Sequence, residues 1–170
     1  MIYLNNTDTT VKIGERQVRI FGVPATPECG TWAFQHPPIR DIGTGKIPSG
    51  TDVLLTHGPP KGHLDSSLRS GCGWLGKELW RTKPRLVVFG HIHHARGRED
   101  VNWDYLQRVY DGVQRGELGI MSVLGMIGVS TAMTLWNRVS GRTKVDTATF
   151  INAAVVGGPG NSEKSSGYDS

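Results

Sequence analysis

Four short runs of apolar residues predict the strands of this chain. They lie at residues 18–23, 52–56, 85–89 and 149–156. The two middle runs, DVLLT and RLVVF, are almost free of polar interruptions, a pattern typical of strands that are covered on both faces. We therefore expect a sheet whose central strands are buried.

The segment between the two middle runs predicts a helix over residues 64–83. Apolar side chains recur there at roughly helical spacing, and Pro84 would end the helix just before the next strand. A strand, a helix and a second strand over this length form a βαβ unit, which requires parallel strands and a right-handed crossover. The apolar residues are Leu68, Leu75, Leu79 and Trp80.

A second helix is predicted from Arg98 onward, because an apolar stripe follows that residue. The Pro- and Gly-rich segment 25–50 is expected to form a long loop. Together these elements predict an α/β fold in one domain over residues 1–158, followed by a disordered tail at 159–170 that is rich in Gly and Ser. The residues of the stripe are Val101, Tyr105, Leu106, Val109 and Val113.

Residues 118–136 contain no charged side chain. Their length is that of a transmembrane helix, but glycine, serine and threonine lower their hydrophobicity. Three interpretations remain open. We favour a helical apolar insertion over about residues 117–140, docked on the domain, over contact with a membrane surface or a true membrane span.

Composition narrows the class of protein further. The 37% of hydrophobic residues is low, and Gly 23 and Pro 9 together make about a fifth of the 170 residues, which argues against a helical bundle. The net charge of +4 suits an anionic ligand and does not indicate a nucleic-acid partner. Two cysteines cannot form a disulfide framework, and no signal-peptide pattern stands at residues 1–10, so we expect a cytoplasmic protein.

Histidines follow both middle strands. His57 ends the first, and His91 and His93 end the second. Ligands of open α/β sheets bind outside the carboxyl ends of the strands, so these three imidazoles should converge if the strands are neighbours. His91 and His93 would also share one face if the strand geometry continued that far. Because neutral imidazole is the commonest metal ligand, the pattern predicts a metal site.

A lone histidine at a strand end is more often a structural residue than a metal ligand. With three histidines in this arrangement, metal binding becomes the favoured interpretation. His36 and His94 lack such placement, and we interpret them as structural or exposed. His63 follows the His57 loop, where it could line a substrate pocket, although a structural role is the favoured alternative. Arg96 comes directly after the histidines and is a second candidate for substrate binding, as a ligand of phosphate oxygens.

These stretches resemble a known family. DVLLTHGPP at residues 52–60 and FGHIH at 89–93 look like the last two ligand motifs of the calcineurin-like metallophosphoesterases. RIFGVP, WAF, IPSGT and FINAA, at residues 19–24, 32–34, 47–51 and 150–154, narrow the resemblance to the MPPED-like subgroup and its fungal members. The resemblance covers residues 1–116 and 146–158.

The resemblance implies a four-layer α/β/β/α sandwich with mixed sheets and a centre of two divalent ions, Mn, Fe or Zn. It places His57 and His91 on one ion and His93 on the other. It further implies a small phosphorylated substrate, with metal-bound hydroxide attacking phosphorus. The family's DxH, GDxxD-type and GNHD motifs do not occur in this sequence. We therefore identify no catalytic residue, and the chain resembles a C-terminal portion of the family domain without its N-terminal part.

Three hypotheses follow from the sequence. The first is a metal-dependent phosphoester hydrolase, of the phosphomonoesterase or cyclic phosphodiesterase type, of which this chain carries the C-terminal half of the site. The second is a catalytically inactive fragment or a binding module of the same family. The third is a membrane-associated variant that contacts the bilayer through residues 118–136.

Overall fold

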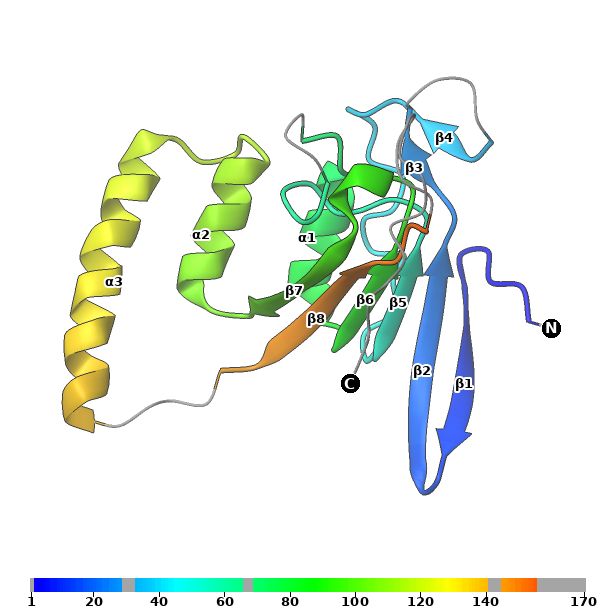
Figure 1. The fold of residues 1–170 in the computed structure, drawn as a ribbon, viewed down its shortest axis with the longest axis horizontal. Coiled ribbons are helices and arrows are strands. Elements are labelled where there is room, and N and C mark those ends of the chain that lie inside the picture. The colour runs from blue at the N-terminus through cyan, green and yellow to red at the C-terminus, as the bar shows by residue number, and fades with distance from the viewer. Residues whose placement is uncertain (1, 29–32, 66–68, 141–144, 156–170) are drawn as a thin grey trace.

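The computed structural model describes residues 2–28, 33–65, 69–140 and 145–155. Within them, the main feature is a mixed six-stranded sheet of order β1-β2-β5-β6-β8-β7 (Figure 1). The four inner strands run parallel, and β1 and β7 pair antiparallel at the two edges. The α/β class with a mixed sheet is therefore confirmed. The strands are β1 (Thr7–Ile13), β2 (Arg16–Val23), β5 (Val53–Thr56), β6 (Leu86–Phe89), β7 (Gly97–Asn102) and β8 (Thr147–Asn152).

The βαβ unit is present as β5, α1 (Gly73–Thr82) and β6, with parallel strands. The helix begins later than the sequence pattern predicts. Asp65 instead closes a loop, because its Oδ2 accepts the backbone N–H groups of Gly62 and Gly71, each at 3.0 Å. At the other end Lys83 adopts the left-handed conformation (φ 47°) and donates its N–H to the Leu79 carbonyl, which ends the helix before Pro84.

The helix predicted from Arg98 begins only at Tyr105, as α2 (Tyr105–Gln114). The residues before it form edge strand β7, which pairs antiparallel with β8. Val101, assigned to the helical stripe, lies opposite Ala148 in the sheet and is buried there. Asp104 separates the two elements as the N-cap of α2, since its Oδ1 accepts the N–H of Gln107 at 2.8 Å.

The remaining strands lie in segments that carry little apolar pattern. β1 is mostly polar (TDTTVKI) and forms a hairpin with β2 through Gly14, whose φ of 61° suits a tight turn. The expected loop at 25–50 contains a small parallel pair, β3 (Thr26–Pro27) and β4 (Gln35–His36). The predicted strand at 149–156 ends at Asn152, and the expected tail at 159–170 lies outside the described residues.

The hydrophobic core lies on one face of the sheet. Phe21, Leu54, Val87 and Phe150 are aligned across β2, β5, β6 and β8, and all are at least 97% buried. Helix α1 covers this face with apolar side chains that include Leu75 and Leu79. The βαβ unit is thus fixed by burial on the helix side of the sheet.

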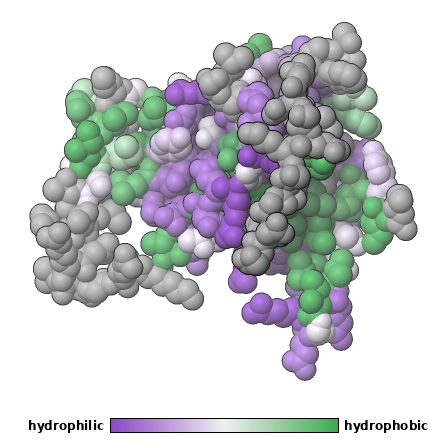
Figure 2. Space-filling view, in the orientation of Figure 1, coloured by the Kyte–Doolittle hydropathy of each residue, from purple (hydrophilic) through white to green (hydrophobic). Residues whose placement is uncertain are grey.

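The opposite face of the sheet is also apolar, and it is only half covered. Strand alternation places Val53, Leu86, Val88 and Ile151 there, each partly exposed, and Leu55 is 38% exposed. Figure 2 shows hydrophobic surface over the strands on the right of the view. Both faces of the central strands therefore carry core-type residues, although helices pack on one of them.

Residues 120–140 form one long helix, α3 (Ile120–Ser140), which packs against α2 and lies away from the sheet (Figure 1). Its first half exposes Met121, Leu124 and Ile127. In the described part of the chain, no helix combines the length and the apolar character needed to cross a bilayer.

Candidate functional site

His57 follows β5 and is held by its own backbone. Its N–H donates to the Val23 carbonyl at 3.2 Å, and its carbonyl accepts the N–H of Gly90 at 3.0 Å. The ends of three neighbouring parallel strands, β2, β5 and β6, are thereby joined, and the imidazole of His57 is left exposed. The sheet itself positions this side chain.

His91 lies next to His57. The His57 Nε2 and the His91 Nδ1 are 3.1 Å apart, and the ring centroids are separated by 4.8 Å. His91 has a φ of 69°, unusual for a residue with a side chain, and the Ile92 N–H turns back to the Gly90 carbonyl at 2.8 Å. β6 ends at Phe89, so the strand geometry expected through His93 does not continue, and a tight turn orients His91 instead.

Gly58 leaves room for this arrangement. A Cβ at this position would lie 2.6 Å from the Thr26 Oγ1 and 4.0 Å from the His91 Cδ2. Thr26 is buried in β3, so a side chain at position 58 would displace it. The glycine therefore lets the His57 loop pack against β3.

His93 begins a short 3₁₀ turn, η1 (His93–Ala95), and its side chain is exposed. Among the described residues, no three side chains of His, Cys, Asp or Glu come close enough to hold one metal ion. Burial, and then the nearby His57 and His93, lower the pKa of His91, so its ring is neutral at pH 7. The structure thus pairs His57 with His91 and leaves His93 outside the pair.

The imidazole pair fits part of a metal site. Two nitrogens bound to one tetrahedral ion at about 2.0–2.1 Å lie about 3.3–3.4 Å apart, and the observed spacing of 3.1 Å is close to this. Two imidazole rings supply two of the three or four protein ligands that such a site needs and no negative charge. The described residues therefore provide two ligands of the right kind and an incomplete set.

Asn152 is the residue of this site that the sequence analysis missed. It ends β8, is 99% buried, and its Nδ2 donates to the carbonyls of Ile92 (2.9 Å) and Leu64 (3.1 Å). Its Oδ1 accepts the N–H of Ala154. The sequence signal that could have identified it is a polar asparagine at the end of an apolar strand, in the stretch FINAA. Asn152 fastens the histidine turn to β8.

His63 is an interior residue. Its ring is 97% buried, with Nδ1 3.2 Å from the Glu99 Oε2 and Nε2 3.1 Å from the Asp111 Oδ1. Burial lowers the pKa of His63, but the bonds to Asp111 and Glu99 outweigh it and raise the pKa to about 9. With both nitrogens engaged, the geometry fits the structural interpretation of His63 and leaves no free atom for a substrate.

The other candidates lie as follows. His94, within the 3₁₀ turn, and Arg96, directly after it, are exposed, and the Arg96 N–H donates to the His93 carbonyl. His36 is buried, with Nδ1 2.9 Å from the Pro37 carbonyl and Nε2 accepting from the Trp74 indole at 3.3 Å. The side chain of Arg96 is thus at the surface, and His36 is structural.

Comparison with known proteins gives similar sequences and no matching family model. Over 163 residues, 93% of this chain, it is 40% identical to a protein of Emericella nidulans named "Probable rhamnogalacturonate lyase C", of which it covers 15%. Over 103 residues it is 41% identical to the human "Metallophosphoesterase domain-containing protein 1", covering 30% of it. A UPF0046 protein of Caenorhabditis elegans is 38% identical to this chain over 86 residues, and the chain covers 22% of its length.

The chain spans less than a third of the length of each of these relatives. The similarity to proteins named for a metallophosphoesterase domain, together with the UPF0046 proteins, supports a metallophosphoesterase-like family.

Proposed function

We propose that this chain carries the C-terminal half of the site of a metal-dependent phosphoester hydrolase. The substrate would be a small phosphomonoester or cyclic phosphodiester. The observation that carries the proposal is the pair of imidazole nitrogens, 3.1 Å apart, at the carboxyl ends of two parallel strands. The named metallophosphoesterase relatives support the same class of chemistry.

Each residue of the site has a defined role in this proposal. His57 and His91 would hold a divalent ion through their facing ring nitrogens, and Asn152 orients the turn that carries His91. His93 serves a second ion, and Arg96 binds phosphate oxygens. When bound, divalent ions would polarise the phosphoryl group and make water a better nucleophile. Carboxylate ligands, which balance the charge of such ions, would come from a longer polypeptide, since this chain covers 30% of the human relative.

A binding module without activity is the second candidate. It is favoured by the incomplete ligand set, because the described residues bring two imidazoles together and no third ligand. The name of the Emericella nidulans relative does not support a lyase activity for this chain. The chain covers 15% of that protein and is also similar to proteins named for a metallophosphoesterase domain.

Metal binding by the purified chain tests the proposal. Wild type and the variants His57→Ala and His91→Ala are equilibrated with Mn²⁺ or Zn²⁺, and bound metal is measured by equilibrium dialysis with elemental analysis. We expect each substitution to weaken binding by about tenfold or more, since half of the nitrogen pair is lost. His94→Ala is the matched control, because this exposed neighbour lies outside the pair.

Turnover separates the two candidate functions. Hydrolysis of an aryl phosphodiester that depends on Mn²⁺ and is lost in His91→Ala supports the hydrolase. Metal binding without turnover supports the binding module. Unchanged metal binding in His91→Ala contradicts the proposed metal site, because the imidazole pair would then hold no ion.

A further inference from the structure

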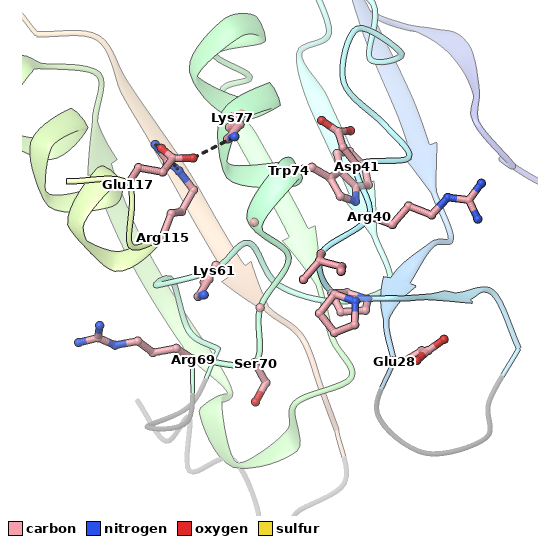
Figure 3. A pocket seen from close by; sticks show the side chains of 15 residues that line it. Glu28, Arg40, Asp41, Lys61, Arg69, Ser70, Trp74, Lys77, Arg115 and Glu117 are labelled. Carbon is pink, nitrogen blue, oxygen red and sulfur yellow. Dashed lines mark hydrogen bonds and ion pairs between the residues drawn. The ribbon is translucent and has the colours of Figure 1, made fainter. Parts of the chain in front are cut away.

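A second concave site lies apart from the histidine pair. A pocket of about 480 Å³ opens beside the N-terminal end of α1, and Figure 3 shows the side chains that line it. Its walls come from α1, the 69–71 loop, the segment after β4 and the end of α2. None of His57, His91 and His93 lines it. The volume lies in the range of small-molecule sites, about 300–1,000 Å³.

The pocket is lined by more positive than negative side chains. Five cations, Arg40, Lys61, Arg69, Lys77 and Arg115, face three acids, Glu28, Asp41 and Glu117. The carboxylate of Glu117 is already held by Lys77 at 3.0 Å and by Arg115 at 2.9 Å. That of Asp41 accepts the N–H groups of Gly43 and Thr44 and is engaged with the Thr44 hydroxyl.

Three cations of the pocket form no ion pair with another described residue: Arg40, Lys61 and Arg69. In Figure 3, Lys61 lies between the other two, and the guanidinium groups of Arg40 and Arg69 extend to opposite sides. The pocket wall therefore carries one ammonium and two guanidinium groups that are not paired with a described carboxylate and can turn towards a bound anion.

Lys61 is held in place by its backbone. Its N–H donates to the Cys72 carbonyl at 3.1 Å, and the Cys72 N–H donates to the Pro59 carbonyl at 2.9 Å. A Cβ at Gly71 would lie 2.6 Å from the Pro60 carbonyl oxygen, so glycine alone allows this close packing. The first turn of α1, which starts at Gly73 in the pocket wall, has no acidic side chain to neutralise the positive end of the helix dipole.

From this cluster we propose that the pocket is an anion site, separate from the histidine pair, that binds the phosphate group of a small molecule through Lys61 and Arg69. A phosphate dianion matches the excess of two positive charges and can accept hydrogen bonds from both a lysine and an arginine, and the open side of the pocket leaves room for the rest of a small molecule. The inference does not depend on metal at His57 and His91.

Isothermal titration of the 170-residue chain with inorganic pyrophosphate, in excess EDTA, tests the site. Wild type is expected to bind, and Lys61→Gln and Arg69→Gln are each expected to raise the Kd by about tenfold, because one charged hydrogen-bond donor is lost. Lys61→Arg should keep most of the affinity. The matched control is Lys12→Gln, which removes the same charge from an exposed position on β1.

Two further titrations define the ligand class. Tighter binding of pyrophosphate than of citrate at equal ionic strength supports a phosphate site, and adenosine monophosphate tests whether the phosphate is free or carried by a nucleoside. The proposal is overturned by absence of binding at millimolar pyrophosphate, by equal loss in Lys12→Gln, by citrate binding as tightly as pyrophosphate, or by loss of binding in His57→Ala.

Discussion

At the scale of single residues, backbone hydrogen bonds and dihedral angles determine where the side chains of the site lie. His57 is fixed by backbone hydrogen bonds to the end of β2 and to Gly90, directly after β6, and His91 is turned towards it by a positive φ. The sequence pattern could indicate that His57 and His91 meet, since both follow neighbouring parallel strands. It could not indicate the turn after Phe89, which depends on the Gly90 and Ile92 backbone.

A substitution at Gly58 should disturb this site by sterics. Gly58→Ala places a methyl group 2.6 Å from the Thr26 Oγ1, and such overpacking costs about 1–3 kcal/mol of unfolding free energy. Thr26→Ala removes the obstructing hydroxyl, so the double variant should recover much of the loss. Chemical denaturation of the two single variants and the double variant measures the coupling. If the losses of unfolding free energy in the two single variants add up in the double variant, residues 26 and 58 do not compete for space.

His63 should make stability depend on pH in the alkaline range. Its pKa is raised to about 9 in the folded protein from about 6.5 when unfolded, so its contribution is complete below about pH 6.5 and is lost as pH rises through 9. The shift corresponds to about 3 kcal/mol. Urea unfolding at about pH 6 and about pH 10 should show a larger loss in wild type than in His63→Gln. An NMR titration that gives the His63 ring a pKa near 6.5 would contradict this expectation.

At the scale of elements, apolar periodicity predicted the elements with the strongest patterns. The runs at 52–56 and 85–89 became β5 and β6, because burial on one face and partial burial on the other require continuous apolar sequence. The pattern failed at β7, because Val101 fits the helical spacing of the residues that follow it and only pairing with β8 makes this segment a strand. It also missed β1, whose polar residues belong to an edge.

The end of β8 should be sensitive to loss of its amide. Asn152→Leu removes the donor to the Ile92 and Leu64 carbonyls, and buried groups left without partners cost about 1–3 kcal/mol each. We expect a lower urea concentration at the midpoint of unfolding. If the proposed metal site is present, we also expect weaker metal binding, although the imidazoles of His57 and His91 are both retained. Asn102→Ala, on the exposed side of β7, is the control and should leave both quantities within error.

At the scale of the whole molecule, the sheet has one face under helices and another that is apolar and half covered. The resemblance to metallophosphoesterases implied a second sheet on such a face. The sequence could predict the apolar character of both faces from DVLLT and RLVVF. Which face α1 covers follows only from the crossover and the strand order.

The half-covered face should bind a hydrophobic dye. Leu55 is 38% exposed and lies beside Val53 and Val88, so anilinonaphthalene sulfonate fluorescence should rise when the folded chain is added. Leu55→Glu should reduce this signal by placing a charge in the middle of the face. Tyr105→Glu, on α2, tests whether any exposed apolar residue has the same effect. Equal reductions would place the dye elsewhere.

The margins of the sheet differ from its faces in chemical character. Asp8 and Lys12 occupy β1, and Arg98, Glu99 and Asp100 occupy β7, so ionic groups border the sheet on both sides. Charges on outer strands hinder a neighbouring molecule from extending a ladder of backbone hydrogen bonds. Fibrils built by lateral addition of strands at either margin would therefore be disfavoured.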